Sequence, residues 1–316
     1  MEIGFIAERA KQLKISSLLI SEGLRTGCFS SAFRGQGIEF DSVREYEAGD
    51  DVRTIDWNLT ARSGKTFVEL YREDRDLTVF LCTDFSHSMS IGGGKFTPKE
   101  KAAEVSALLA FAAHNIFSPV GAVFFSGGKG PMFLPHSGED HILSILKSME
   151  NFAFYKNIKP HFQRGTNLAS SLTAVSKILR SRSLVMIISD FKVEGFEKQL
   201  GLLASKHDTV CIRITSDTDF MLHKTGTIPA KDAESGFKTL IPTSNKNFQI
   251  EYKKNYYEEL LRWENLCKRC LAYPVLLNIN DNAAKVLSDF FLSKKNNRYV
   301  LKNNIDKIGE NVWKEF

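Results

Sequence analysis

The chain has 316 residues, of which 43% are hydrophobic and 25% are charged, and its formal net charge is +5. This length allows one large domain or two smaller ones, and the composition excludes a disordered or fibrous protein. The basic excess is spread over the last helices with no block of lysine or arginine, so we expect a solvated surface and no nucleic-acid partner.

The amino-terminal residues 1–20 mix charged and apolar side chains, which predicts a surface helix rather than a signal peptide. No later apolar run reaches the roughly 18 residues that a membrane span needs, so we expect no transmembrane segment. The five cysteines are scattered along the chain, as is typical of a reducing compartment. We therefore expect a cytoplasmic protein, which partners could hold at the inner face of the membrane.

Residues 1–76 are predicted to form an amino-terminal extension, made of the first helix and a charged, loop-rich segment with short strands. Between residues 34 and 76 the chain carries 7 basic and 11 acidic residues, which favours Arg–carboxylate pairs. These pairs could form a buried ion network or a surface for a partner. Trp57, beside Asp56, is either an interface anchor or a core side chain. Residues 68–71 are expected to form an edge strand that leads into the core.

From residue 77 to residue 300, strands and helices alternate. The first predicted strand begins at residue 77, and the others cover residues 120–125, 131–135, 184–188, 209–214 and 273–279. One predicted helix starts with a capping box from Thr97 to Glu100, and the others cover 141–149, 168–179, 196–205, 252–270 and 283–292. Residues 216–249 resemble an inserted hairpin, and residues 301–316 form a carboxy-terminal tail. This order indicates an α/β fold with a doubly wound, mainly parallel sheet that helices cover on both faces.

One cysteine pair needs a decision between packing and chemistry. Cys267 and Cys270 form a C-x-x-C pattern within the predicted helix 252–270, where they continue an apolar stripe of Tyr256, Leu260 and Trp263. This helical spacing favours packing over redox or zinc chemistry, and no second pair of ligands completes a zinc site.

The strongest functional signal is Asp84-x-Ser86-x-Ser88, at the point where the first apolar strand ends. One carboxylate and two hydroxyls suit a hard divalent cation. Asp190 ends another buried strand, so the two carboxylates would share one edge of the sheet if the strands are parallel neighbours. Thr166 places a further hydroxyl at the start of a helix. The competing interpretation is that these residues only cap turns and a helix.

This set resembles the metal-ion-dependent adhesion site of von Willebrand factor A-like domains. The resemblance implies that Ser86, Ser88 and Thr166 donate hydroxyl oxygens to the metal, while Asp84 and Asp190 bind mainly through waters or complete the shell. The sixth position would be left for a carboxylate of a partner. The expected ion is Mg²⁺, with Mn²⁺ or Ca²⁺ as alternatives.

A charged motif in the amino-terminal segment indicates which family of such domains the chain resembles. The chain resembles the bacterial domain-of-unknown-function fifty-eight family from about Arg34 to Asp190, on a set of motifs that precede the metal residues: Arg44-Glu-Tyr46, Gly49-Asp-Asp51, Arg53, Ile55-Asp-Trp57 and Ala61-Arg62. The resemblance implies a von Willebrand factor A-like, Rossmann-like fold. Members are often encoded beside a MoxR-type AAA+ ATPase, and such pairs are thought to act as chaperones.

We therefore expect a non-enzymatic, Mg²⁺-dependent protein-interaction module that captures an acidic residue of its partner. The partner implied by the family is a MoxR-type AAA+ ATPase, one of its client proteins, or a membrane-associated von Willebrand factor A protein. The alternative is a metal-assisted hydrolase of the phosphoesterase kind. The sequence shows neither an evident general base nor a second carboxylate-rich metal site, which such a hydrolase would use.

Overall fold

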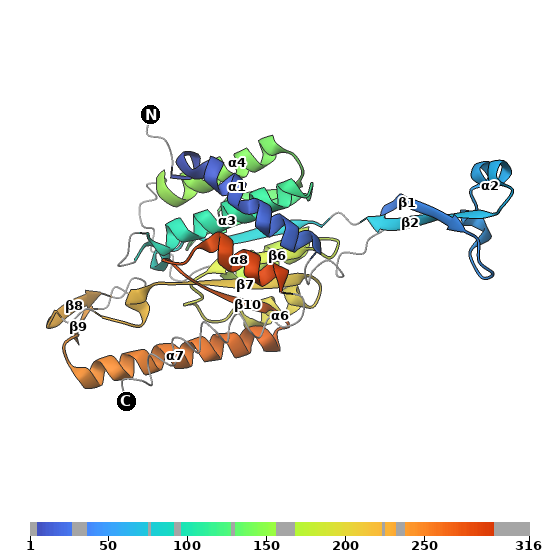
Figure 1. Ribbon diagram of the computed structural model, residues 1–316. Helices are drawn as coiled ribbons and strands as arrows, with labels where there is room; N and C mark the ends of the chain where they lie inside the picture. The colour runs from blue at the N-terminus through green and yellow to red at the C-terminus, as the bar shows by residue number, and fades with distance from the viewer. Residues whose placement is uncertain are drawn as a thin grey trace. The chain divides into compact units, whose positions relative to one another are not determined.

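A six-stranded sheet runs through the larger of the two units into which the chain divides (Figure 1). The computed structural model describes residues 5–26, 37–74, 77–91, 96–127, 130–155, 168–222, 225–231 and 238–293. The strands are β3 (Val79–Asp84), β4 (Val120–Phe125), β5 (Met132–His136), β6 (Leu184–Ser189), β7 (Asp208–Thr215) and β10 (Tyr273–Asn278). Their order in the sheet is β10-β7-β6-β3-β4-β5.

All neighbouring strands of this sheet are parallel except β5, which runs antiparallel to β4 at one edge. Every residue of β3, β4, β6 and β7 is buried, whereas exposure alternates along β5. Continuous apolar runs are typical of parallel strands that are covered on both faces. The prediction of a mainly parallel sheet with a hairpin strand at its edge is therefore confirmed.

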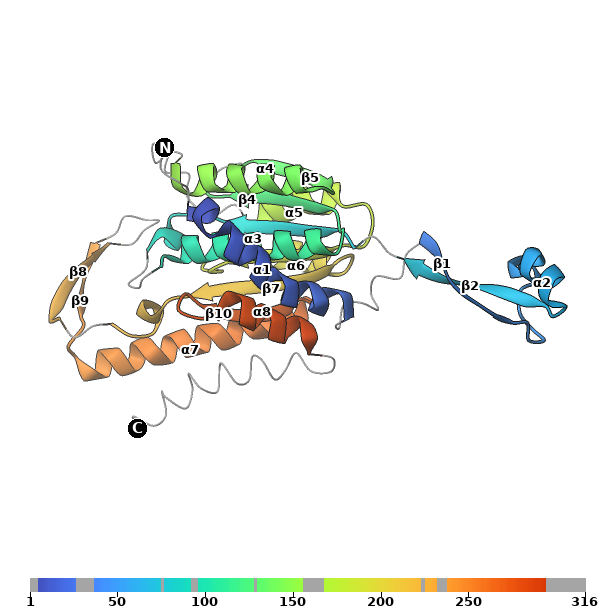
Figure 2. The same ribbon diagram turned by 45° about the horizontal axis from the view of Figure 1, so that its top comes forward.

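Helices cover both faces of the sheet (Figure 2). One face carries α1 (Phe5–Thr26), α3 (Pro98–Asn115), α4 (Glu139–Glu150) and α8 (Ala283–Leu292). A cluster of buried residues from β3, β4, β6 and β7 packs on the other face against α5 (Leu168–Ile178), α6 (Glu197–Ala204) and α7 (Lys246–Arg269). No helix among the described residues combines the length and the apolar character needed to cross a membrane.

The helix α3 follows its predicted start closely. The Thr97 hydroxyl accepts a hydrogen bond from the Glu100 amide at 3.2 Å, and the Glu100 carboxylate accepts one from the Thr97 amide at 2.7 Å. These two bonds form the capping box, with Pro98 at the first helical position. Most of the helix is buried, because α3 lies between the sheet and α1.

The predicted inserted hairpin and the helix that follows it are also confirmed. β8 (Thr227–Lys231) and β9 (Lys238–Pro242) form an antiparallel hairpin within 216–249. The helix that follows begins at Lys246 rather than at 252, because the side chain of Asn245 caps its first turn. In that helix Cys267 is buried together with the predicted stripe, so packing is confirmed as its role.

The smaller unit, Ser30–Leu77, is built on a hairpin of β1 (Gly37–Glu45) and β2 (Phe67–Asp74). The two strands pair antiparallel from Gly37–Asp74 to Glu45–Phe67, and the chain between them holds the short helix α2 (Trp57–Ser63). Residues 68–71 form a strand as expected, within β2, but this strand belongs to a separate two-stranded sheet and not to the core sheet. The nine-residue strand β1 supplies the hydrogen-bond partners of this segment instead.

Side chains near the closed end of this hairpin answer two questions left open by the sequence. Trp57 is 68% exposed, which excludes the core interpretation. The ion pair of Arg44 with Asp50, at 2.6 Å, is only partly buried, and that of Lys65 with Glu45 is exposed. They are surface pairs and not a buried network. The first helix, which the sequence-based division grouped with this segment, belongs with the larger unit, because α1 packs on α3 and α8.

Alanine substitutions at two glycines of the larger unit should change the free energy of unfolding in opposite directions. A Cβ at Gly121 would lie 2.5 Å from the Phe80 ring, so we expect Gly121→Ala to lower the free energy of unfolding by about 1–3 kcal/mol. A Cβ at Gly201, inside α6, would meet only the Cys270 sulfur at 3.9 Å. Gly201→Ala should raise the free energy of unfolding by up to about 1 kcal/mol. Urea unfolding measures both, and changes of the same sign would contradict this packing.

Candidate functional site

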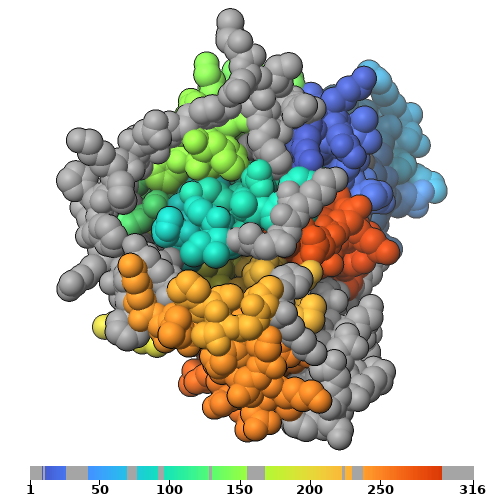
Figure 3. All heavy atoms as spheres, turned by 90° about the vertical axis from the view of Figure 1, so that its left-hand side faces the viewer, coloured from blue at the N-terminus to red at the C-terminus, as the bar shows by residue number. Residues whose placement is uncertain are grey.

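The predicted carboxylates lie side by side at the carboxyl edge of the sheet. β3 and β6 are parallel neighbours, Asp84 is the last residue of β3, and Asp190 directly follows β6. Asp84 is fully buried and Asp190 is 6% exposed. In Figure 3, which faces this edge, the α3 segment (teal) lies between the α4 segment (green) and the chain that follows β7 (orange). The prediction that both carboxylates share one edge is confirmed.

The loop after β3 holds its two serines beside Asp84. Asp84 Oδ1 accepts a hydrogen bond from the Ser86 amide at 2.8 Å, and the hydroxyls of Ser86 and Ser88 lie 3.0 Å apart. Two buried apolar side chains, Phe85 and Met89, anchor the loop in the core. The Phe85 ring packs edge-on against Phe124. The apolar anchors on both sides of the two serines therefore hold the serine hydroxyls next to the carboxylate.

The remaining oxygens of the carboxylate pair differ in their partners. Asp84 Oδ2 accepts a hydrogen bond from the Ser189 hydroxyl at 2.7 Å. Asp190 Oδ1 accepts one from the Lys192 amide at 3.2 Å, whereas Asp190 Oδ2 is buried and has no hydrogen-bond partner in the described part of the chain. A buried carboxylate oxygen without a donor is costly, and a bound cation would relieve this cost.

The electrostatics of the pair point in the same direction. Burial above all, together with the negative charge of Asp190, raises the pKa of Asp84 to about 7. Hydrogen bonds from Ser189 and Ser86 act in the opposite direction and lower this pKa. Two described lysines, Lys99 and Lys192, interact electrostatically with the pair but form no ion pair with it. Lys192 forms an ion pair with Asp219 at 2.7 Å, and burial lowers the pKa of Lys99 although the charge of Asp84 opposes this.

A hard cation fits this set of donors. The site offers two buried carboxylates and two hydroxyls, all oxygen ligands, and one of the carboxylate oxygens lacks a donor. Clusters of three or more His, Cys, Asp or Glu side chains suited to a metal do not occur among the described residues. Any cation here would therefore depend on the hydroxyls. Thr166, the fifth predicted ligand, lies outside the described residues.

Sequence reasoning missed Ser189, which donates to Asp84 from the end of the neighbouring strand. Its position directly before Asp190 was the available signal, since the last residue of β6 must lie level with the end of β3. The anchoring role of Phe85 and Met89 could have been found from their positions as the apolar residues that flank Ser86 and Ser88.

These features define the chain as a doubly wound α/β protein with a buried carboxylate pair and a serine-rich loop at the carboxyl edge of its sheet. A family model described as "Protein of unknown function DUF58" matches residues 42–260. Because this match covers more than half of the chain, the protein belongs to that family.

Relatives with curated sequences carry no assigned activity in their names. The uncharacterized protein Rv1480 of Mycobacterium tuberculosis is 28% identical over 231 residues, which is 73% of this chain and 71% of that protein. The uncharacterized protein Mb1516 of Mycobacterium bovis matches to the same extent. Among solved structures, the conserved hypothetical protein BatB from Bacteroides thetaiotaomicron gives a TM-score of 0.41 at 14% identity, covering 74% of this chain and 99% of that one. An aerotolerance-related membrane protein from Bacteroides fragilis gives 0.41 at 15% identity, covering 73% and 99%.

The raised pKa of Asp84 makes the stability of the metal-free protein depend on pH. The folded chain holds this proton up to about pH 7, whereas the ordinary value is 3.8, so the free energy of unfolding should fall as the pH rises between these values. The full loss would be on the order of 4 kcal/mol. Asp84→Asn cannot titrate and should flatten the profile.

Urea unfolding between pH 4.5 and 8, at constant ionic strength and without divalent ions, measures this dependence. Asp217→Asn is the matched control, because Asp217 is an exposed carboxylate on the segment that follows the neighbouring strand β7. Profiles of the wild type and Asp84→Asn that run parallel would show that Asp84 is not the titrating group.

Proposed function

We propose that this protein is a non-enzymatic, Mg²⁺-dependent protein-interaction module with a von Willebrand factor A-like fold. Asp84, Ser86, Ser88 and Asp190, together with Thr166, would hold the ion. The observation that carries the proposal is the buried pair of Asp84 and Asp190, in which Asp190 Oδ2 has no hydrogen-bond partner among the described residues. A divalent cation would satisfy this oxygen and relieve the repulsion between the carboxylates.

The donor types explain why binding is favoured over catalysis. Hydroxyls are neutral ligands, so a site with only two carboxylates leaves the ion attractive to a further acidic group. When bound, the ion would supply one strong and oriented bond to the carboxylate of a partner. Among the described residues, the hydrogen bonds to the pair come from the Ser86 amide, the Ser189 hydroxyl and the Lys192 amide, and none of them involves a histidine that could act as a general base.

We further propose that the partner is a MoxR-type AAA+ ATPase or one of its client proteins, with this chain as adaptor. Support for the partner class comes from family membership and from the charged motif of the smaller unit. Trp57 and Val52 are exposed in that unit, and Val68 is the only buried apolar side chain among residues 42–69. Exposed tryptophan beside charged groups is typical of interface anchors. The smaller unit would thus provide a second contact surface.

Metal binding should appear first as a gain in stability. Mg²⁺ at about 100 times its dissociation constant should add about 2.7 kcal/mol to the free energy of unfolding, because only the folded chain presents the complete donor set. Asp84→Asn and Asp190→Asn should lose this gain, and Asp217→Asn should keep it. Thermal unfolding with and without Mg²⁺ is the measurement. An equal gain in all four proteins would place the ion elsewhere.

Partner capture tests the function itself. From native cell extract, the wild type should retain an AAA+ ATPase or its clients in Mg²⁺ and release them in chelator. Asp84→Ala should retain neither, and Trp57→Ala should weaken capture in Mg²⁺ while it keeps the gain in stability that Mg²⁺ gives, because its contact would not involve the ion. Asp217→Ala serves as the control.

The proposal fails if capture is unchanged in Asp84→Ala and in chelator. It also fails if the wild type hydrolyses phosphate esters in a metal-dependent way that Asp84→Ala abolishes, since that result would indicate the hydrolase.

A further inference from the structure

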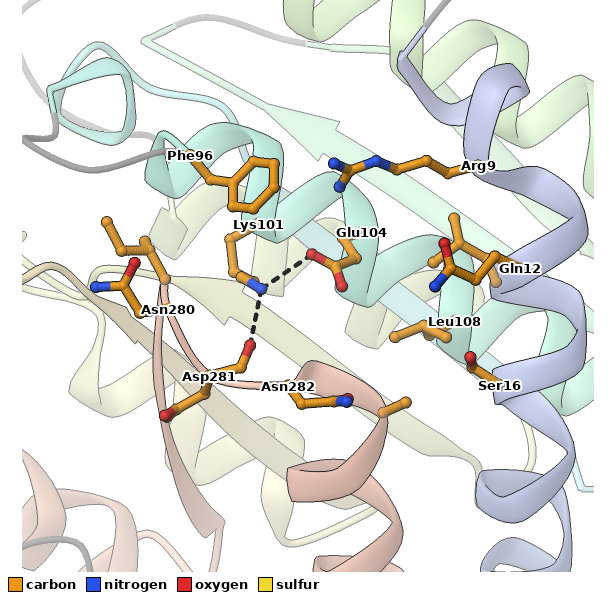
Figure 4. A pocket seen from close by; sticks show the side chains of 13 residues that line it. Arg9, Gln12, Ser16, Phe96, Lys101, Glu104, Leu108, Asn280, Asp281 and Asn282 are labelled. Carbon is orange, nitrogen blue, oxygen red and sulfur yellow. Dashed lines mark hydrogen bonds and ion pairs between the residues drawn. The ribbon is translucent and has the colours of Figure 1, made fainter.

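A cavity of about 420 Å³ lies apart from the carboxylate pair, between α1, α3 and the loop that joins β10 to α8 (Figure 4). None of Asp84, Ser86, Ser88 and Asp190 lines it. Its apolar lining includes Leu13 and Leu108, which are buried. Its polar lining comes from all three elements, so the cavity exists only because distant parts of the chain fold together.

A buried ammonium group faces this cavity. Lys101 is 3% exposed, and its Nζ donates to the backbone oxygen of Asp281 and to the Glu104 carboxylate, both at 3.0 Å. An ammonium has three N–H donors, and these two bonds use two of them among the described residues. Glu104 matches the charge of this buried lysine, and an acceptor in the cavity would use its third N–H group.

A second cationic group reaches the same end of the cavity. The Arg9 guanidinium carbon lies 4.6 Å from the centroid of the Phe96 ring, and Lys101 Nζ lies 5.7 Å from it. Figure 4 shows the Arg9 side chain extending from α1 towards Phe96, above Lys101 and Glu104. Stacking on the ring restrains the guanidinium, whose planar donors suit a carboxylate or a phosphate.

Two residues that line the cavity, Glu104 and Asp281, carry carboxylates. Glu104 is the carboxylate that pairs with Lys101, and the Asp281 carboxylate accepts a hydrogen bond from the Asn278 amide at 3.0 Å. The end of the cavity at Phe96 therefore holds the cations of Arg9 and Lys101, together with the Glu104 carboxylate that pairs with Lys101. Neutral side chains, Gln12 and Asn282, complete the polar wall.

We propose that this cavity binds a small organic oxyanion, a carboxylate or a phosphate monoester. Its charged group would lie between Arg9 and Lys101, and its apolar body would pack on Leu13 and Leu108. Charge-assisted hydrogen bonds from a guanidinium and an ammonium are the strong contacts for such a group, and an apolar floor favours an organic body over a bare inorganic ion. This proposal is independent of the metal site.

The test uses the full chain in buffer freed of divalent ions by a chelating resin, at constant ionic strength. Calorimetric titrations with benzoate, phenyl phosphate and inorganic phosphate distinguish a carboxylate from a phosphate and measure the contribution of the apolar body. We expect saturable binding of benzoate or of phenyl phosphate, with inorganic phosphate at least several-fold weaker.

Variants of opposite expected effect locate the ligand. Arg9→Gln should weaken binding by about 10- to 100-fold, since it removes a charge-assisted hydrogen bond. Glu104→Gln should strengthen binding several-fold, because it removes the carboxylate that competes for Lys101. Lys11→Gln is the matched control, an exposed cation on the same helix that does not line the cavity.

Two results would overturn the proposal. The first is the absence of saturable binding of all three probes to the wild type at millimolar concentrations. The second is equal weakening in Arg9→Gln and Lys11→Gln, which would show a general charge effect. Arg9 is only partly buried, so its replacement should leave the fold intact, and far-ultraviolet circular dichroism of each variant checks this.

Discussion

Two carboxyl groups at the ends of neighbouring parallel strands impose the main constraint on the larger unit. Pairing of β3 with β6 brings Asp84 and Asp190 to the same level of the sheet, and β4 covers the other side of β3. Asp84 is thereby removed from water, and no cation among the described residues forms an ion pair with it. Its neighbours compensate through hydrogen bonds from Ser86 and Ser189, which stabilise a carboxylate but cannot neutralise it. The apolar anchors of the serine loop keep this arrangement in place.

The helix α3 connects the carboxylate pair with the cavity. It starts a few residues after the serine loop, and its first turn carries Lys101, whose ammonium bonds the β10–α8 loop. Small side chains such as Ala102 and Ala103 let the helix lie close to the sheet, while α1 packs over it from outside. A change in the position of its first turn would therefore be felt at both places, since tightly packed elements move as units.

Regular patterns in the sequence were enough to predict most of the larger unit. Apolar runs, the capping box at Thr97 and the strand ends at Asp84 and Asp190 each depend on local chemistry, which the sequence displays directly. The pairing of β2, the exposure of Trp57 and the contact of Ser189 with Asp84 depend on which segments meet in space. The cavity is the extreme case, because Arg9, Lys101 and Asp281 are distant in the chain and no local pattern links them.

Each outermost strand of the six-stranded sheet carries a proline, Pro135 in β5 and Pro274 in β10, and the four strands between them carry none. Proline lacks the N–H group that a further strand would need as a donor, and it is tolerated at sheet edges for that reason. Both borders of the sheet are thereby poor templates for strand addition, by another copy or by an extended peptide. Recognition through backbone pairing is disfavoured, and the side chains at the carboxyl edge are left as the surface through which this sheet can select what it contacts.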